Sequence, residues 1–570
     1  MRRTYIYNKV KALALVTLLA PCASFFLAGC GDFLEIEPQD KVVLEKFWKE
    51  KADVDNVLLG CYSAMQSANV LDRIMVWGEF RSDNIEAGTN LTDDYSLKKV
   101  VNEAIEEDNA YTTWDGIYDV INRCNIVLHY APEVAAKDPA YTDAMLKNTQ
   151  FEAKALRALC YFYLIRTFKN VPYITEATID DNQKFDLPAT PFNEVLDKLI
   201  ADLEGIKDLS NGAIKAYPST QALYKTGRMT QQAVYAMLCE MYLWKQDYQK
   251  CIDYGQLVVD AKKEEQTNKY PGTVLDADGR LGGYPLELSR PTGYQYFGYN
   301  YQKIFGMSNA DASDATSDEN IFELVFWQSE SMLQNNSVDR LYASGTKYNS
   351  VRGLVAPAKS LVYDKNVSAN VFKQTDGRYY QSIREVTGAG TSTYSIGKYV
   401  LTSMLLNVTG TDVSPYLYSS QINGHNHANW IVYRLSDVML LMAEAYAEQN
   451  NLTKSFELVK AVNNRSMCEA TVASLTQPLT QDAMRKLVLE ERRRELLFEG
   501  KRWYDLVRRS MRDGNTDVLC EYFSKKTLEG SSAAAKQRLK KLDAIFWPYN
   551  HDETVVNTNL VQNPAYKPLQ

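Results

Sequence analysis

Apolar residues recur every three or four positions over long stretches of this chain, which is the spacing of amphipathic α-helices. After Thr190-Pro191 we expect a helix whose buried face comprises Phe192, Val195, Leu196, Leu199, Ile200, Leu203 and Ile206. Residues 232–259 predict two helices that join near Gln246-Asp247, and helix returns at Ser436. A further helix is expected from Thr480 to Glu499, with Gly500 as a left-handed cap at its end.

Three of the predicted helices share a local feature, a small residue three positions before a tyrosine. The pairs are Ala158 and Tyr161, Cys239 and Tyr242, and Ala443 and Tyr446. In tetratricopeptide-type helical hairpins, a small residue of one helix packs against an aromatic residue of its neighbour. Because the spacing between the copies is irregular, the pattern predicts helical hairpins and not a uniform solenoid.

Residues 265–430 differ from the rest of the chain. Gly, Ser, Asn, Asp and Tyr cluster there, the long helical periodicity is lost, and short β-type runs occur at 321–327 and 399–406. This composition predicts a large insertion of long loops and short strands. The expected fold class is therefore mainly α, with helical hairpins that carry a loop-rich insertion containing short β-strands.

The first 29 residues have the pattern of a secretory signal. A basic segment ends at Lys11, residues 12–28 are apolar, and the segment closes with Leu27-Ala28-Gly29-Cys30. That ending resembles a bacterial lipobox, in which the cysteine is acylated and cleavage leaves it as the first residue. We therefore predict lipidation at Cys30, and more than one acyl chain would anchor the protein stably. A plain signal peptide with an incidental cysteine is the alternative.

Composition and charge narrow the possible functions. Of 570 residues, 45% are hydrophobic and 24% are charged, which disfavours a disordered chain and a multi-span membrane protein. The formal charge of −8 becomes −12 without the four basic residues of the signal, so a nucleic acid is not expected as a partner. Beyond the signal and Cys30, seven cysteines remain with no C-x-x-C, which disfavours a disulfide framework and a zinc site.

Catalytic motifs are absent from the sequence. It contains no G-x-S-x-G, no G-x-x-x-x-G-K-[ST] and no H-E-x-x-H. His425 and His427 have no carboxylate nearby at metal-ligand spacing. Glycoside hydrolysis needs only two carboxylates at a fixed separation, so the 71 acidic residues leave that reaction open. We expect no catalytic residue, no metal ligand and no cofactor.

Seven segments, in order, resemble the signatures of the SusD/RagB family of Bacteroidetes outer-membrane lipoproteins. They are Asp32–Glu35 with Pro38, Trp77–Asn84, Trp114–Leu128, Glu152–Tyr173, Tyr433–Ala445, Glu491–Leu506, and Phe546–Pro548 with Asn563–Tyr566. The resemblance covers nearly all of residues 30–570. It departs mildly in the tail, where Tyr549-Asn550-His551 follows Pro548 and the family more often shows an aliphatic residue and another proline.

The resemblance implies a right-handed scaffold of four tetratricopeptide-like helical pairs under a loop-rich ligand face. It divides the chain into a signal (1–29), an N-terminal helical region (30–230), a helical hairpin (231–264) and a C-terminal region (265–570). Within the last, the ligand face covers 265–430 and a helical part covers 431–510, before an irregular tail.

The same resemblance implies a surface-exposed lipoprotein of the outer membrane that is attached only through its lipid anchor. Such proteins bind oligosaccharides or polysaccharides, act as a lid on a SusC-like TonB-dependent β-barrel, and are not enzymes. Capture of peptides or glycopeptides is the first alternative. A surface glycoside hydrolase and an adhesive or structural lipoprotein are the others.

Tyrosines concentrate in 282–301, a loop punctuated by glycine and proline. Sugars stack their CH faces on flat aromatic rings, while amides and arginines bind the hydroxyls, and loops present such groups on a rigid scaffold. The expected ligand-binding residues of this loop are Tyr284, Arg290, Tyr294, Tyr296, Tyr299, Asn300 and Tyr301, and Gln295 lies among them. The alternative is that these tyrosines hold the loop against the body of the protein.

Further candidates lie outside that loop. Trp327 either faces the same loops or packs in the core. A second candidate region follows the Trp77–Asn84 signature and comprises Asn90, Asp93, Asp94 and Tyr95, for which a solvated polar turn is the alternative.

Other conspicuous residues are interpreted as structural. We assign to the core the aromatic residues on amphipathic helices, namely Trp114, Tyr118, Tyr161, Tyr242, Tyr446 and Trp503. Arg81 and Asp83 are expected to hold the fold. In the run Glu490–Glu495, acids flank three arginines, which predicts i,i+4 ion pairs, partly at a helix interface.

Overall fold

A computed structural model describes most of the chain after the signal. The described residues are 47–88, 91, 94–179, 186–218, 221, 223–272, 276, 279–290, 295–305, 317–326, 334–345, 350–388, 391–410, 412–420, 426–468, 475–529 and 532–566. The signal peptide and Cys30 lie outside them. The chain divides into two compact units, Met1–Lys49 and Glu50–Gln570, and every element below belongs to the second.

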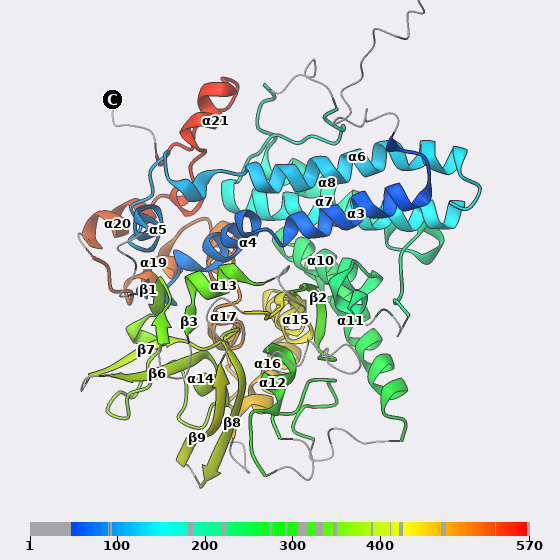
Figure 1. Ribbon diagram of the computed structural model, residues 1–570. Coiled ribbons are helices and arrows are strands. Elements are labelled where there is room, and N and C mark those ends of the chain that lie inside the picture. Colours follow the sequence, from blue (N-terminus) through cyan, green and yellow to red (C-terminus); the bar gives the residue numbers. More distant parts are fainter. Residues whose placement is uncertain are drawn as a thin grey trace, which may run out of the picture. The chain divides into compact units, whose positions relative to one another are not determined.

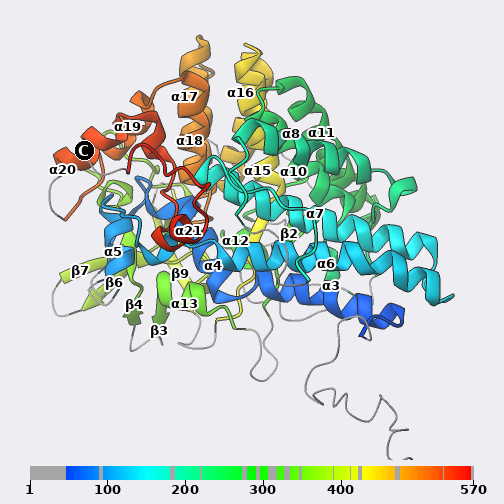
Figure 2. The ribbon, with the colours of Figure 1, turned by 90° about the horizontal axis from the view of Figure 1, so that it is seen from above.

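Long helices form most of this unit (Figure 1). They are α3 (Lys51–Met65), α6 (Asp115–Lys137), α7 (Asp143–Phe168), α8 (Phe192–Ile206), α10 (Gln231–Trp244), α11 (Tyr248–Lys269), α15 (Leu435–Glu448), α16 (Leu452–Ser466), α17 (Gln481–Glu495) and α18 (Arg502–Asp513). Helices α3, α6 and α7 run alongside one another (Figure 2), α7 packs on α8, and α10 packs on α11. Helix α11 then packs on α15, which also contacts α16 and α17.

The helices bury the residues that the sequence pattern predicted. All seven apolar residues assigned to one face of α8 are buried. Helices α10 and α11 form the expected hairpin, and Gln246 in the turn between them has a left-handed φ of 64°. Ala158, Cys239 and Ala443, which precede the three tyrosines, are also buried. Among the described helices, none combines the length and the apolarity of a membrane-spanning segment.

Short helices connect and extend this scaffold. They are α4 (Ala68–Met75), the π-helical turn η2 (Val76–Phe80), α5 (Tyr95–Val101), α9 (Tyr224–Gly227), α12 (Tyr299–Phe305), α13 (Asn336–Leu341), α14 (Gly377–Ser382), α19 (Asp517–Phe523), α20 (Ser532–Leu539) and α21 (His551–Val556). The 3₁₀ turns are η4 (Ala110–Thr112), η5 (Leu209–Asn211), η8 (Lys359–Leu361) and η9 (Leu542–Ile545). Three of the helices, α12, α13 and α14, lie inside the predicted insertion, which is therefore not made of loops and strands alone.

The strands form antiparallel pairs. They are β1 (Ile85–Ala87) with β5 (Val355–Pro357), β2 (Asn320–Leu324) with β10 (Trp430–Arg434), β3 (Ala343–Gly345) with β4 (Ser350–Arg352), β6 (Ile383–Gly388) with β7 (Thr391–Ile396), and β8 (Leu401–Thr409) with β9 (Asp412–Ser420). Strands β2 and β8 correspond to the two short runs expected from the sequence. The structure thus confirms the expected fold class, mainly α with short strands in a loop-rich insertion.

Helix α17 ends earlier than the sequence predicted. Thr480 caps its first turn by accepting from the backbone N–H of Ala483, but the helix stops at Glu495 and not at Glu499. Gly500 has the expected left-handed φ of 69°, but it lies beyond a turn that follows α17 and does not cap that helix. A Cβ on Gly78 would come within 1.8 Å of the Gly500 carbonyl oxygen, so the two backbones pack against each other at these glycines.

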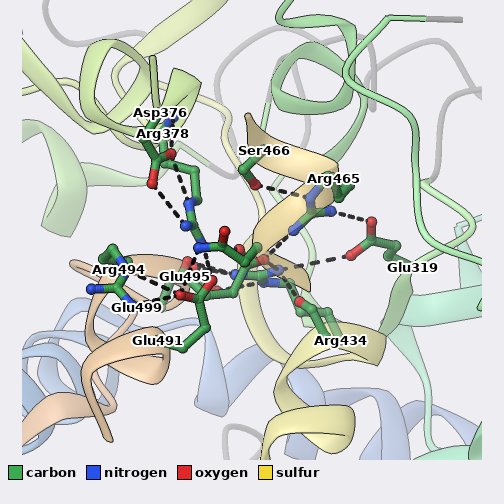
Figure 3. A network of polar contacts seen from close by, with 12 residues as sticks. Glu319, Asp376, Arg378, Arg434, Arg465, Ser466, Glu491, Arg494, Glu495 and Glu499 are labelled. Carbon is green, nitrogen blue, oxygen red and sulfur yellow. Dashed lines mark hydrogen bonds and ion pairs between the residues drawn. The ribbon is translucent and has the colours of Figure 1, made fainter. Parts of the chain in front are cut away.

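A buried network of ion pairs joins the insertion to the helical scaffold (Figure 3). Glu495 at the end of α17 lies at its centre and accepts from three arginines. Arg434 Nη1 lies 2.5 Å and Arg378 Nη1 lies 2.9 Å from its carboxylate oxygens, and Arg465 pairs with it as well. Arg378 comes from α14 in the insertion, whereas Arg465 comes from α16. The network therefore fixes where the insertion lies on α16 and α17.

The predicted i,i+4 ion pairs within Glu490–Glu495 were largely wrong. Arg494 does pair with Glu491 on the same helix, at 2.7 Å and three residues apart. Arg492 instead contacts Asp437 and Asp505, and Arg493 contacts Asp83. Because these sides of α17 are buried, the side chains pair with other segments and not along the helix surface.

Arg81 and Asp83 hold the fold, as the sequence analysis predicted. Both side chains are buried. Arg81 pairs with Glu103 at 2.5 Å, and Asp83 lies 2.9 Å from both Arg493 and Arg502. The Trp77–Asn84 signature segment is thus tied to α17 and α18 through Asp83.

Buried ion pairs make the stability of the fold depend on pH. Burial alone would raise the pKa of Asp83, Asp437 and Glu444, but their cationic partners outweigh burial and lower each pKa to about 2. Since the unfolded carboxylates titrate near pH 4, the stabilisation is complete above about pH 4 and is lost as the pH falls towards about 2. We expect the free energy of unfolding to fall in that window by on the order of 2 kcal/mol per carboxylate, and the urea midpoint to fall with it.

Urea unfolding at pH 5 and at pH 3 checks this expectation. In Asp437→Asn, which has one titrating carboxylate fewer, the difference between the two pH values should be smaller. An equal difference in both proteins would show that Asp437 does not contribute to the acid sensitivity.

Candidate functional site

Near the end of the tyrosine-rich segment 282–301, Phe297 and Gly298 contact strand β8 of the β8–β9 hairpin. Phe297 forms an isolated antiparallel bridge with Leu406 of β8, with N–H to carbonyl distances of 3.2 and 2.8 Å. The backbone N–H groups of Gly298 and Tyr299 both donate to the carbonyl of Ser289, at 2.9 and 3.1 Å. The backbone is thus turned back at Ser289 and joined to β8 at Phe297.

Gly298 allows this close approach. Its φ is 107°, and a Cβ there would lie 2.0 Å from the Met404 carbonyl oxygen on β8. A side chain at this position would combine an unfavourable backbone conformation with a clash. Only glycine lets the loop meet the strand at this point.

Two of the expected ligand residues support the loop from inside. Tyr301 is 1% exposed, and its hydroxyl donates to the Gly397 carbonyl at 2.9 Å. Asn300 is 4% exposed and accepts from Gln381 at 3.2 Å. Both lie on α12, which packs on β8. Because both side chains are buried, they support the loop from beneath and do not form part of a ligand-facing surface.

Tyr296 lies at the surface and forms a stacked pair with Tyr416 of β9. The ring centroids are 4.0 Å apart and the planes differ by 10°. Tyr296 is half-buried, whereas Tyr416 is 57% exposed. A side-chain hydrogen bond with Tyr416 raises the pKa of Tyr296. We call Tyr296 and Tyr416 the tyrosine pair.

The other described candidates of the loop border this pair or lie along the same segment. Arg290 and Gln295 are exposed, and the Arg290 guanidinium carbon lies 4.6 Å from the centre of the Phe297 ring. Tyr299 is half-buried. Tyr284 is also half-buried, with Lys263 Nζ 5.3 Å from its ring centre. The loop therefore offers a guanidinium and an amide beside flat aromatic rings.

The remaining candidates divide into two groups. Tyr294, Trp327 and Asn90 lie outside the described residues. Tyr95 opens α5 and is 69% exposed, with Lys99 Nζ 4.7 Å from its ring centre. Helix α5 packs on β1 and η4, and Figure 1 shows it well apart from the β8–β9 hairpin, so Tyr95 does not join the tyrosine pair.

The aromatic residues assigned to the core lie inside the protein. Trp114, Tyr161, Tyr242 and Trp503 are buried, and Tyr118 and Tyr446 are half-buried. Within the described ranges, no three His, Cys, Asp or Glu side chains come together in a way that could hold a metal ion. Of the two loop histidines, His427 is buried and His425 is outside the described residues.

The tyrosine pair can bind a flat apolar surface that carries polar groups at its edge. Two stacked phenols present ring faces, and the hydroxyls, Gln295 and Arg290 supply donors and acceptors around them. Sequence reasoning missed Tyr416, which is 120 residues away from Tyr296. A signal for it exists in Tyr416-Leu417-Tyr418, a run of large side chains between Ser414-Pro415 and Ser419-Ser420.

Comparison with known proteins gives matches along nearly the whole chain. The family model of the SusD family matches residues 293–566, and a model described as starch-binding associating with outer membrane matches 32–243. SusD-like protein P38 of Formosa agariphila is 24% identical over 565 residues, which cover 97% of this chain and 98% of that protein.

Solved structures share the fold. A SusD superfamily protein from Bacteroides thetaiotaomicron superposes with a TM-score of 0.63 at 20% identity, covering 91% of this chain and 99% of the other. A laminarin-binding SusD-like protein superposes with a TM-score of 0.62, also at 20% identity, covering 91% and 100%.

Proposed function

The chain belongs to the SusD/RagB family, and from that premise we propose that it is a carbohydrate-binding lipoprotein of the outer membrane and not an enzyme. It captures oligosaccharide or polysaccharide nutrients at the cell surface. It then delivers them to a SusC-like TonB-dependent β-barrel transporter.

The observation that carries this proposal is the tyrosine pair. Two stacked, solvent-facing rings are held on a hairpin by the Phe297–Leu406 bridge and by the buried foundation of α12. Aromatic rings presented on a rigid support suit the CH faces of sugar rings. Further support comes from the match to the starch-binding family model and from the likeness to a laminarin-binding protein.

The proposed ligand face combines residues from the structure and from the sequence. The tyrosine pair stacks on the sugar, while Arg290, Gln295 and Tyr299 contact its hydroxyls. Tyr284, beside Lys263 of α11, remains a proposed ligand residue on sequence grounds. Tyr294, Trp327, Asn90 and Tyr95 remain proposed ligand residues on sequence grounds. Asn300 and Tyr301 are excluded from this face because both are buried.

Native gels cast with a panel of polysaccharides test the function. Soluble protein that begins after Cys30 should be retarded by one class of glycan, and the incubated glycan should show no new reducing ends. New reducing ends would overturn the binding-protein proposal in favour of a glycoside hydrolase. Migration unchanged by every glycan would contradict carbohydrate capture and favour a peptide ligand.

The lipid anchor is tested separately. In Cys30→Ala there is no thiol to acylate, so we expect the protein to leave the membrane fraction, because a chain without acyl groups has no buried hydrocarbon to hold it there. Fractionation of cells that express either form, followed by immunoblotting, measures the effect. Cys22→Ala, which changes a cysteine inside the signal, is the matched control and should remain in the membrane. Retention of Cys30→Ala in that fraction would contradict lipidation at Cys30.

A further inference from the structure

A pocket of about 310 Å³ lies where the tail of the chain meets the helical scaffold. It is bounded by α6, by the segment Pro172–Thr178 that follows α7, and by α21 with the residues after it. None of the described residues that line it belongs to the loop-rich insertion, so the pocket is separate from the tyrosine pair. Its volume is at the lower end of the range of about 300–1,000 Å³ that is typical of small-molecule sites. We call it the α6–α21 pocket.

Apolar side chains form one part of the lining. They are Tyr118, Ile121, Pro172, Ile174, Val556 and Leu560. Val556 is 79% exposed and lies at the mouth, and Tyr118 and Ile174 are half-buried. This surface can therefore be reached from solvent, and it can bury the apolar body of a ligand.

Hydrogen bonds to the main chain hold one wall of the pocket in place. Asn122 of α6 donates to the Thr178 carbonyl at 3.3 Å and accepts from the Thr178 N–H at 2.8 Å. The Tyr118 hydroxyl donates to the Pro172 carbonyl at 2.6 Å. These bonds fasten the segment after α7 to α6, so the shape of the wall is set by the fold itself, which favours binding.

The charges of the lining are all negative. Asp115 and Glu553 are its charged groups, and the described lining contains no lysine or arginine. Asp115 is partly compensated, because Arg73 Nη2 lies 3.7 Å from its carboxylate. Burial raises the pKa of Glu553, and the carboxylates of Asp115 and Asp552 raise it further. A hydrogen bond with Trp114 lowers this pKa, but no cation of the described chain does. Glu553 is thus an uncompensated carboxylate beside an apolar surface.

We propose that the α6–α21 pocket binds a small organic ammonium ion, such as an aryl-alkylamine. The apolar lining takes the hydrocarbon body, and Glu553 accepts a charge-assisted hydrogen bond from the ammonium group. The aromatic ring of Tyr118 also favours a cation. An anion would be repelled by Asp115 and Glu553. This inference goes beyond the proposed capture of glycans and uses none of the residues of the proposed ligand face.

Three probes of similar shape isolate the contribution of charge. Tyramine, tyrosol and 4-hydroxyphenylacetate share a phenol ring and end in an ammonium, a hydroxyl and a carboxylate group. In isothermal titration of soluble protein that begins after Cys30, tyramine should bind at least about tenfold more tightly than tyrosol, as for a charge-assisted hydrogen bond. 4-Hydroxyphenylacetate should not bind. A crystal soaked with tyramine should show its ammonium group at Glu553.

Substitutions on α21 locate the binding. Val555 and Val556 are both exposed, but only Val556 lines the pocket. Val556→Lys places an ammonium group of the chain itself three residues from Glu553 on the same helix, so it should weaken tyramine binding at least about tenfold. Val555→Lys adds the same charge outside the lining and should bind tyramine as the unaltered protein does. Glu553→Gln should reduce the affinity for tyramine to that for tyrosol, and its tyrosol affinity should be unchanged.

A lysine side chain is the other source of an ammonium group. A Gly-Lys-Gly peptide with blocked ends represents it and should bind more weakly than tyramine. Tighter binding of the peptide would overturn the assignment to a free amine.

Three further results would contradict the proposal. They are the absence of saturable tyramine binding below about 10 mM, equal affinities for tyramine and tyrosol, and equal tyramine binding by Val555→Lys and Val556→Lys. Retardation of the unaltered protein in polysaccharide gels does not depend on this pocket, so failure here is distinguishable from failure of the proposed function.

Discussion

Tyr296→Ala/Tyr416→Ala should abolish the retardation of the protein by its glycan while its melting temperature changes by no more than about 2 °C. The two rings are stacked at 4.0 Å on the surface, and Tyr416 is mostly exposed, so their removal leaves no buried cavity. Each ring contributes stacking of about 0.5–1.5 kcal/mol, so the loss of both weakens binding by about 100-fold at the upper limit. Affinity electrophoresis and a thermal melt measure the two quantities.

Tyr301→Phe is the matched control within the same loop. It removes only the buried hydroxyl that donates to Gly397, so we expect stability to fall by about 1 kcal/mol and glycan binding to persist. Full binding by the double tyrosine variant would place the ligand face elsewhere. A large drop in its melting temperature would show that the rings hold the loop to the hairpin, which is the alternative that the sequence left open.

Local periodicity predicted the helices because each buried face is formed by residues that lie close together in the sequence. In α8 every apolar position of the 3–4 pattern is buried, since α7 and α10 pack against that face. The end of α17 was missed for the opposite reason. Gly500 has the left-handed backbone of a helix cap, but it lies beyond a turn, and its carbonyl packs on Gly78, more than four hundred residues away, where only glycine leaves room for it. The sequence shows both glycines and not the contact between them.

The candidate site shows the same division between local and distant causes. Composition indicated the loop and Tyr296, because tyrosines cluster between glycines and prolines there. Tyr416 lies against Tyr296 because the neighbouring residue Phe297 forms a bridge with Leu406 on the hairpin. This long-range bridge leaves no local pattern in the sequence. Tyr301 was assigned to the ligand face although Tyr301, Ile304 and Phe305 have the spacing of a buried helical face, and they are indeed buried on α12. A helix hidden in a loop-like composition explains that assignment.

The ion-pair network shows why polar patterns are harder to interpret than apolar ones. An arginine on a helix suggests a partner one turn away, which is correct only where the helix surface is exposed. Arg492 and Arg493 are buried, and their partners belong to α15, α18 and the segment after η2. The choice of partner therefore follows from tertiary packing.

The Glu495→Gln substitution should destabilise the fold strongly although it is a conservative change. Glu495 meets Arg378, Arg434 and Arg465 in a buried cluster, and the arginines outweigh burial and hold its pKa well below the ordinary value. The amide removes the charge and offers one acceptor oxygen to three guanidinium groups. We expect a loss of about 3–5 kcal/mol in the free energy of unfolding, as for other buried ion pairs that lose one partner. Urea unfolding at pH 7 measures this loss.

The exposed pair of Glu521 and Lys486 supplies the control. Its atoms lie 3.5 Å apart and both side chains are more than half exposed, so Glu521→Gln should change the free energy of unfolding by less than about 1 kcal/mol. Because Arg378 belongs to the insertion, Glu495→Gln should also speed limited proteolysis within 265–430 more than within α6 or α7. Equal stability of the two variants would mean that apolar packing alone fixes the insertion. Uniform proteolysis along the chain would mean that Glu495 stabilises the whole fold and does not specifically hold the ligand face.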